Sequence, residues 1–567
     1  MDLDLASKQE ARDLVARTRR AFETFRHFSQ EMIDDICFAA VEAGFRESRR
    51  LAEMAVAETG FGRVEGKFQK NAFSTRGLWE YIRDLRTAGL VAADDARGLY
   101  DYADPFGVVA AIIPTTNPTS TALFKALICL KSRNGMVCSP HPRAAKCIAE
   151  AIRVIHDAAT AAGAPRDILT CMTTVSLEGT EELMQAKGID LILATGGSGL
   201  VKAAYSSGKP AFGVGPGNAP AYVDRSADAA HAAHCLVESQ TFDNSTICAS
   251  EQSLVIDRPI RDALLFELKK RRAHHCSPTE AKLLERIVMK GRGMNPDIVG
   301  RYPHELANMA GFNVAKETTI LLADCDGVGF DHPLSIEKLS PILSMFTVDG
   351  WEAGCERSIE VLRFGGMGHT LALHCTDQKI IREFAEKKPV NRLVVNSPSA
   401  QGAVGYTTNL VPSMTLGCGS FGGNITSDNI GPLHLLNIKR LAYVKPGYGT
   451  PAWIGDFKEP LPPRHRTDRP EAAGPSGAGV WPSRHHGALA APKDTGAHVH
   501  GDGCGHGHGV SPSRPDVQAS NMAPVTREDV ERLVASLLAA KGGTCALGRC
   551  SDCPPAGTVC HHGQTAR

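Results

Sequence analysis

The sequence lacks an excess of charge of either sign, and it lacks any long apolar run. Its 62 Lys and Arg residues equal its 62 Asp and Glu residues, so no global field would draw the chain to nucleic acid or to an anionic membrane. No apolar stretch approaches the roughly 18 residues that a membrane-spanning helix needs. The first residues, with Asp2 and Asp4, lack the basic and apolar segments of a signal peptide. These absences predict a soluble, cytoplasmic protein without nucleic-acid or membrane partners.

The 17 cysteines also lack the spacing of a disulfide framework. Most of them lie singly in the first 455 residues, as expected for reduced thiols. The others crowd between Cys504 and Cys560, which marks a tail of a different kind. With 567 residues, the chain has room for about three or four domains of the usual size.

One cysteine, Cys248, stands where a polar segment meets a strand-like apolar run. The stretch from Ser239 to Asp257 reads S-Q-T-F-D-N-S-T-I-C-A-S-E-Q-S-L-V-I-D. A thiol on a polar loop beside a buried strand is held by a rigid scaffold and stays open to a ligand, which suits a nucleophile. A buried, inert thiol is the other interpretation, because most free cysteines are of that kind. This stretch alone leaves both open.

Three other loops follow runs that are typical of strands buried in a parallel sheet. Open α/β sheets build their sites at such strand ends. Glycines between a strand and a helix also let a phosphate approach backbone N–H groups. An Asn-Pro turn and a turn histidine without chemistry are the alternatives. The strands and the loop residues that follow them are 107–114 with Thr115 and Asn117, 135–138 with Ser139 and His141, and 190–194 with Thr195, Gly196 and Gly197.

The loop around Cys248 resembles the active-site loop F-D-N-x-x-I-C-A-S-E-Q of the CoA-acylating aldehyde dehydrogenases. The resemblance covers roughly Leu14 to Val444 and includes G-G-M-G-H-T at 365–370, residues 392–397 and the glycine-rich segment 412–437. It implies an α/β fold like that of aldehyde dehydrogenases. A Rossmann-type NAD-binding domain is expected at residues 1–235, completed by about 430–455, with an α/β catalytic domain at 236–429.

The resemblance also implies roles for single residues. Cys248 is the expected nucleophile, and the side-chain amide of Asn117 is expected to bind the oxyanion. Glu337, in E-K-L-S-P, resembles the glutamate of E-x-F-G-P that holds the nicotinamide ribose. Ser139 and His141 stand where hydrolytic relatives carry a lysine, which favours NAD over NADP. The expected cofactor-binding residues are Thr115, Ser139, His141, Thr195, Gly196, Gly197, Val214 and Glu337.

Val214 stands where the hydrolytic relatives carry the glutamate that activates water. A valine cannot take a proton from water, so a thioester should survive until another thiol attacks it. The implied function is NAD-dependent oxidation of a short-chain aldehyde to its acyl-CoA, with CoA as co-substrate, in a homodimer or homotetramer. The alternatives are a hydrolytic aldehyde dehydrogenase, a phosphorylating or semialdehyde reductase on the same fold, and a non-catalytic protein that binds metal through its Cys/His tail.

The composition changes at about residue 456. Residues 456–523 are rich in Pro, Gly and His, which predicts a disordered linker, and 544–567 form a Cys/His-rich tail without a predicted dedicated metal site. Between them, 524–543 predict an amphipathic helix that suits docking. It resembles the encapsulation peptides of bacterial microcompartments, which implies location inside such a compartment and contacts with shell proteins or other cargo. Packing on its own subunit is the alternative.

Overall fold

The structure is a computed structural model that describes residues 2–445 and 448. The predicted linker, docking helix and Cys/His tail lie outside the described residues. None of the helices in the described part of the chain combines the length and apolar character needed to cross a lipid bilayer. The helices are α1 (Leu3–Phe25), α2 (Gln30–Arg46), α3 (Ser48–Thr59), α4 (Val64–Ala72), α5 (Leu78–Ile82), α6 (Pro118–Lys131), α7 (Ala145–Ala161), α8 (Leu177–Gln185), α9 (Ser198–Ser206), α10 (Ala229–Thr241), α11 (Arg261–Lys270), α12 (Pro278–Val288), α13 (Pro303–Ala310), α14 (Gly350–Gly365), α15 (Gln378–Lys387) and α16 (Ser399–Ala403).

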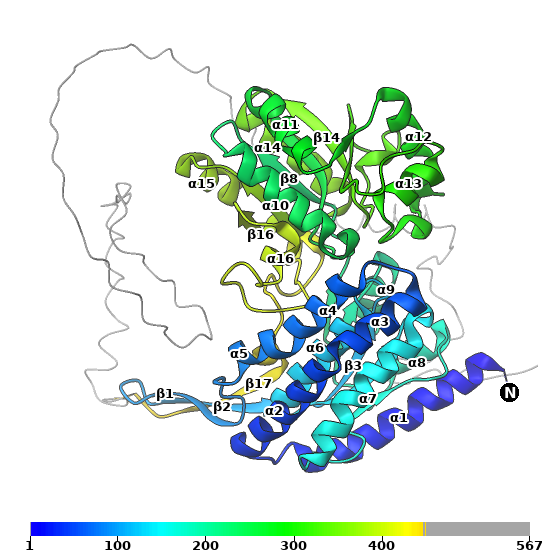
Figure 1. Ribbon diagram of the computed structural model, residues 1–567. Helices are drawn as coiled ribbons and strands as arrows, with labels where there is room; N and C mark the ends of the chain where they lie inside the picture. Colours follow the sequence, from blue (N-terminus) through cyan, green and yellow to red (C-terminus); the bar gives the residue numbers. More distant parts are fainter. Residues whose placement is uncertain (1, 446–447, 449–567) are drawn as a thin grey trace, which may run out of the picture. The chain divides into compact units, whose positions relative to one another are not determined.

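The first half of the chain builds a five-stranded sheet of parallel strands (Figure 1). Its spatial order is β5 (Leu169–Cys171), β4 (Gly135–Pro140), β3 (Val108–Ile113), β6 (Leu191–Thr195) and β7 (Ala211–Val214). Helices α6 and α7 pack on each other as crossovers on one face. The connection through α8 runs back across the sheet, so its right-handed crossover places α8 on the other face, where it packs against α1.

The strand β3 explains why this sheet forms. All six of its residues are buried, and four of them are β-branched, as expected for a strand covered on both faces. The order of strands reverses between β3 and β6. The loops after these two strands therefore part from each other and leave a crevice at the carboxyl end of the sheet.

A seven-stranded parallel sheet follows in the second half of the chain. Its spatial order is β10 (His274–His275), β13 (Leu321–Asp324), β14 (Ile342–Val348), β9 (Glu251–Asp257), β8 (Ala219–Val223), β15 (Gly368–His374) and β16 (Val390–Val395). A two-stranded hairpin stands beside it, made of β11 (Met289–Lys290) and β12 (Gly293–Met294). The mixed α/β fold with parallel sheets is the predicted fold class.

The chain passes between the two sheets at a different place from the predicted domain boundary. β7 ends at Val214 in the first sheet and β8 begins at Ala219 in the second, so the crossing lies at 215–218. Residue 235 instead lies inside α10, whose Leu236 belongs to the core of the second sheet. The run A-P-A-Y-V carries no signal of which sheet it joins, because a buried strand looks the same in either. The assignment of a cofactor-binding and a catalytic domain stays a prediction.

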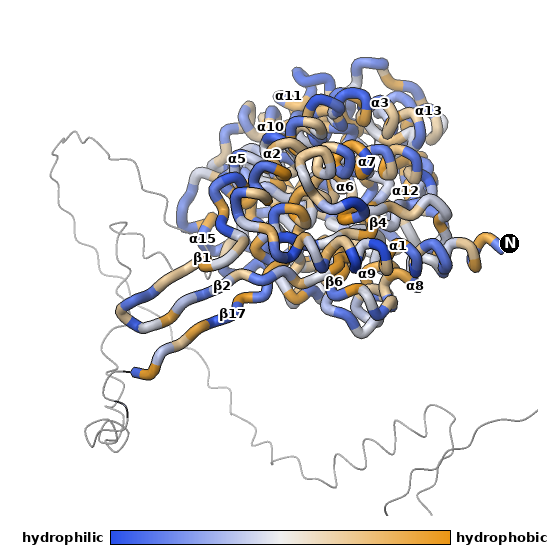
Figure 2. The backbone as a smooth tube through the Cα atoms, turned by 90° about the horizontal axis from the view of Figure 1, so that it is seen from below, coloured by the Kyte–Doolittle hydropathy of each residue, from blue (hydrophilic) through white to orange (hydrophobic). Residues whose placement is uncertain are grey.

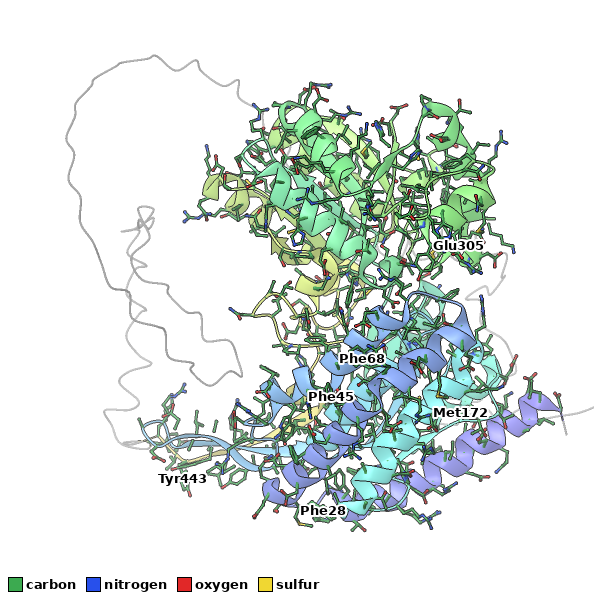
Figure 3. The ribbon with its side chains drawn as sticks, in the orientation of Figure 1. Phe28, Phe45, Phe68, Met172, Glu305 and Tyr443 are labelled. Atoms are coloured by element: carbon green, nitrogen blue, oxygen red, sulfur yellow. The ribbon has the colours of Figure 1, made fainter. Side chains whose placement is uncertain are left out.

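A three-stranded antiparallel arm extends from the body (Figures 1 and 2). It consists of β1 (Gly89–Asp94), β2 (Leu99–Pro105) and β17 (Leu436–Ala442). β17 thus brings the end of the described chain back beside β2. Tyr443, which Figure 3 labels on this arm, is 65% exposed.

Candidate active site

A cavity of about 500 Å³ lies at the carboxyl ends of β3, β4, β6 and β7, and the loop with Cys248 forms part of its wall. All ten residues singled out from the sequence line it: Thr115, Asn117, Ser139, His141, Thr195, Gly196, Gly197, Val214, Cys248 and Glu337. Their individual roles stay predictions. The wall also includes Thr116 and Leu339, which stand inside loops that the sequence singles out, and the segment 175–177 and Met294, for which the sequence offers no signal.

The loop that carries Cys248 begins with a strained turn. Asp243, Asn244 and Ser245 have φ angles of 51°, 50° and 64°, a left-handed conformation that costs energy for residues other than glycine. Side-chain bonds hold the turn in place. The Asp243 carboxylate accepts the backbone N–H of Arg63 at 2.6 Å, and the Asn244 amide donates to the carbonyl of Gly300 at 3.0 Å. The D-N of the motif therefore fixes the path of the chain into Cys248.

The partner of Cys248 is a histidine that lies far from it in the chain, on β15. His369 Nε2 lies 3.1 Å from Cys248 Sγ, although 121 residues separate the two in the chain. Its other ring nitrogen, Nδ1, lies 2.9 Å from Thr370 Oγ1, and this hydroxyl oxygen can accept a hydrogen bond from a protonated Nδ1. Strand β15 brings His369 to the site. The preceding Gly368 permits this, because a Cβ at that position would lie 1.8 Å from the carbonyl oxygen of Cys418.

Burial keeps both members of this pair uncharged. It raises the pKa of the Cys248 thiol to about 12, with Glu337 and Cys418 adding to the effect and Arg392 opposing it. Burial, together with the nearby Arg392 guanidinium, lowers the pKa of His369 to about 3. At neutral pH a thiol therefore faces a neutral imidazole. Such a pair can pass the proton from Sγ to Nε2 while the sulfur attacks, rather than beforehand.

Asn117, which lines the same cavity as Cys248, is the N-cap residue of α6. Its Oδ1 accepts a hydrogen bond from Lys70 Nζ at 2.6 Å. Its Nδ2 donates to the carbonyl oxygen of Thr246 at 3.1 Å and to Thr116 Oγ1 at 3.2 Å. The amide is thus held at its oxygen and at its nitrogen. A ligand oxygen could replace Thr116 Oγ1, which accepts the longer of the two Nδ2 hydrogen bonds.

Glu337 is the carboxylate on the cavity wall. Its Oε1 accepts the backbone N–H of Gly217 at 2.7 Å, and burial raises its pKa to about 6. Gly217 in turn packs on the Cys248 loop, since a Cβ there would lie 1.8 Å from the Cys248 carbonyl oxygen. Val214 lines the same cavity, so the cavity has a valine at that position and one carboxylate, Glu337, that acts on the thiol.

The opposite end of the cavity suits a dinucleotide. Thr195 Oγ1 is a buried oxygen without a hydrogen-bond partner among the described residues. The helix α9 after it begins without a side-chain cap, so its first N–H groups are available to a phosphate. Ser139 Oγ is already bonded to Thr180 Oγ1 at 2.8 Å, and burial lowers the pKa of His141. The donor set fits a nicotinamide cofactor.

Three possible metal ligands gather outside the cavity. The donor atoms of His274, Cys276 and Glu280 lie within 4.8 Å of one another. Glu280 already accepts the Ser277 N–H at 2.7 Å in a capping box at the start of α12. The cap accounts for the position of the carboxylate without an ion.

The fold and the cavity define an α/β protein with a cysteine thiol on the wall of a cavity at the carboxyl end of a parallel sheet. The aldehyde dehydrogenase family model matches residues 1–277. The chain is 42% identical over 439 residues to the bifunctional aldehyde-alcohol dehydrogenase AdhE of Escherichia coli, covering 76% of this chain and 49% of that protein. It is 32% identical over 440 residues to the succinate-semialdehyde dehydrogenase (acetylating) of Clostridium kluyveri, covering 77% and 97%. The chain belongs to the aldehyde dehydrogenase family.

Solved structures agree with this assignment. An acetylating aldehyde dehydrogenase from Geobacillus thermoglucosidasius matches with a TM-score of 0.78 and 46% identity, over 78% of this chain and 98% of that one. A propionaldehyde dehydrogenase from the fucose utilisation microcompartment of Clostridium phytofermentans matches with a TM-score of 0.69 and 26% identity, over 76% and 96%. The chain spans about half the length of the bifunctional relatives that it matches.

Proposed function

We propose that the protein oxidises a short-chain aldehyde to its acyl-CoA with NAD, through a thioester on Cys248. The observation that supports this most is the 3.1 Å distance between His369 Nε2 and the Sγ of Cys248, a residue that lines the cavity. A thiol that is uncharged by burial needs a base at hydrogen-bond distance to become a nucleophile. His369 is such a base, and it was absent from the predicted site.

The first step forms a thiohemiacetal. Cys248 Sγ attacks the aldehyde carbonyl carbon, and its proton passes to His369 Nε2. The carbonyl oxygen gains negative charge and accepts a hydrogen bond from the Asn117 Nδ2–H that now points to Thr116 Oγ1. Bound NAD supplies the acceptor for the hydride that leaves the carbon. What stays on Cys248 is an acyl group in a thioester.

The second step transfers the acyl group to CoA. Val214 is 2% exposed and offers no proton acceptor, so water entering the cavity meets no base at that position. After His369 has released its proton to solvent, the CoA thiol attacks the thioester carbonyl carbon. The bond from that carbon to Cys248 Sγ breaks and the CoA thiol proton passes to Cys248 Sγ, so acyl-CoA leaves and the Cys248 thiol is restored. The preference for NAD over NADP is carried by Ser139 and His141, which bring no cation to the adenosine end of the cavity.

A hydrolytic reaction is the second candidate, because Glu337 lines the cavity with a pKa raised to about 6. A carboxylate with that pKa could activate water. Its Oε1 is engaged by the Gly217 N–H, which opposes that role. The two candidates differ in whether the acyl group needs CoA to leave.

The test measures NADH formation from acetaldehyde, propionaldehyde and sulfoacetaldehyde, with and without CoA. Sustained turnover should require CoA, and Cys248→Ala should abolish it. NADH formation at the same steady rate without CoA would instead establish the hydrolytic reaction. Substantial turnover by Cys248→Ala would remove the thioester from the mechanism.

Location and assembly belong to the same proposal. The microcompartment enzyme among the structural relatives supports a role as cargo of such a compartment, with 524–543 as the docking segment and a homodimer or homotetramer as the assembly. Fusing residues 524–543 to a fluorescent protein and following its co-localisation with shell proteins tests the docking. A fusion that stays diffuse would refute it.

A further inference from the structure

Helix α4, on which Figure 3 labels Phe68, buries two lysines against the Cys248 loop. Lys67 and Lys70 are each 2% exposed. Both pair with one carboxylate, Asp243, at 3.1 Å and 2.5 Å. Burial lowers the pKa of Lys70 to about 8, so at pH 7 the two ammonium groups and one carboxylate carry a net positive charge. An unbalanced buried charge is costly, so its retention beside the nucleophile calls for a reason.

Lys70 uses all of its donors on groups of the active site. An ammonium group has three N–H donors and no acceptor. Those of Lys70 point to Asn117 Oδ1 at 2.6 Å, to Asp243 Oδ2 at 2.5 Å and to Thr246 Oγ1 at 2.9 Å. Lys67, one turn earlier, reaches the same carboxylate but bonds the backbone carbonyl of Thr116 instead of the Asn117 side chain.

This contact decides which way the Asn117 amide faces. An ammonium group can only donate, so the atom in front of Lys70 must be the amide oxygen. The amide nitrogen then lies on the other side, where it donates to the Thr246 carbonyl at 3.1 Å. A flipped amide would set two donors against each other at Lys70 and two acceptors against each other at Thr246.

We propose that Lys70 is a positioning residue. It holds the Asn117 amide so that the N–H faces the oxygen of the substrate carbonyl that Cys248 attacks. Its charge also polarises the amide through Oδ1, which makes the N–H a stronger donor. A donor fixed before the reaction costs no reorganisation when the oxyanion forms. The inference rests on the proposed roles of Cys248 and Asn117.

The experiment follows acylation of Cys248 by 4-nitrophenyl acetate in single turnovers of the full chain, without NAD or CoA. This reaction passes through the same kind of oxyanion, so it tests Lys70 separately from the proposed function. Asn117→Ala should slow acylation by about 10²–10³-fold. Lys70→Met should slow it by about 10–10²-fold, in the maximal rate and not in the ester concentration that gives half of it.

Two further variants separate positioning from a general loss of structure. Lys67→Met removes a cation from the same carboxylate and leaves the Asn117 contact, so it should cost less than about threefold. If Lys70 acts through Asn117, adding Lys70→Met to Asn117→Ala should cost less than about threefold again, because coupled residues are not additive. Acylation by Lys70→Met as fast as by Lys67→Met would overturn the proposal. So would a Lys70→Met effect of equal size in the presence and absence of Asn117.

Each variant is first checked for native circular dichroism. Should Lys70→Met not fold, Lys70→Gln takes its place, because its amide keeps one N–H donor without the charge. It should be slower than Lys67→Met, and its effect should vanish in Asn117→Ala; a full effect there overturns the proposal. Acylation of the Cys248→Ala variant at the wild-type rate would also overturn the proposal. A failure of CoA-dependent NADH formation alone would instead count against the proposed function.

Discussion

Replacing His369 by alanine should slow the attack of Cys248 by about 10²–10⁴-fold, the usual contribution of a positioned general base. The structure gives the reason for so large an effect. With a thiol pKa of about 12, only about one thiol in 10⁴ is ionised at pH 8. The neutral imidazole at 3.1 Å removes the need for a preformed thiolate. Without it, the reaction has to proceed through the rare ionised form.

The pH dependence tests this reasoning more sharply than the rate alone. The pKa of His369 is lowered to about 3, so the imidazole is neutral above pH 5. The wild-type acylation rate should therefore change little from pH 5 to pH 7, a range that lies below the pKa of about 8 of Lys70. In His369→Ala the thiolate fraction should set the rate, which then rises about tenfold for each pH unit. The assay is acylation by 4-nitrophenyl acetate across this range.

His374 offers a matched control on the same strand. It is also fully buried, and burial lowers its pKa to about 4, but it makes no hydrogen bond with the thiol. His374→Ala should lose stability and keep the flat pH profile. A His369→Ala variant with a flat profile and a rate within about threefold of wild type would refute the role of the imidazole.

Three further predictions concern the same cavity. Val214→Glu should raise CoA-independent NADH formation by about 10²-fold or more, because it restores a base for water; an unchanged dependence on CoA would refute the reading of that position. Gly217→Ala should lower the Tm and slow acylation, because its Cβ would meet the Cys248 carbonyl at 1.8 Å, whereas Gly215→Ala, with open space around its Cβ, should keep the wild-type Tm. Burial raises the pKa of Glu251 to about 7, so between pH 4.5 and 7 the folded state keeps a proton that the unfolded chain releases. The free energy of unfolding should therefore fall by about 3 kcal/mol as the pH rises from 4.5 to 7. Denaturant unfolding across that range should show the slope in wild type and not in Glu251→Gln.

Much of the fold was predictable because buried parallel strands leave a dense local signal. The run at 107–114 forms β3, buried along its whole length, and the glycines after β6 lie where a phosphate can approach. The place where the chain changes sheets was not predictable. Ala219–Val223 is apolar enough for either sheet, and only its pairing with β9 and β15 places it in the second.

The site shows the same division. Cys248, Asn117 and the cofactor loops could be picked out because each lies next to a strand end or a motif. His369 could not be picked out, although it lies in the stretch G-G-M-G-H-T. Nothing in that stretch indicates that β15 brings the histidine to a thiol 121 residues away. Lys67 and Lys70 were missed for a related reason. Charged residues on a short helix look like a solvated surface, and only their shared bond to Asp243 shows that they are buried.

His369 and Lys70 together explain why the thiol can remain uncharged until a substrate is present. Proton transfer to His369 creates a cation next to Arg392, which lowers the pKa of that imidazole, so the ion pair is disfavoured while the site is empty. When a carbonyl is present, the charge that leaves the sulfur comes to rest on an oxygen in front of the Asn117 N–H, whose amide Lys70 holds and polarises through Oδ1. The cost of charging His369 is then offset by an anion that exists only in the reacting complex. A thiol arranged in this way gains its reactivity from the aldehyde itself, which keeps it unreactive toward other electrophiles until a carbonyl oxygen occupies the position that the Asn117 N–H faces.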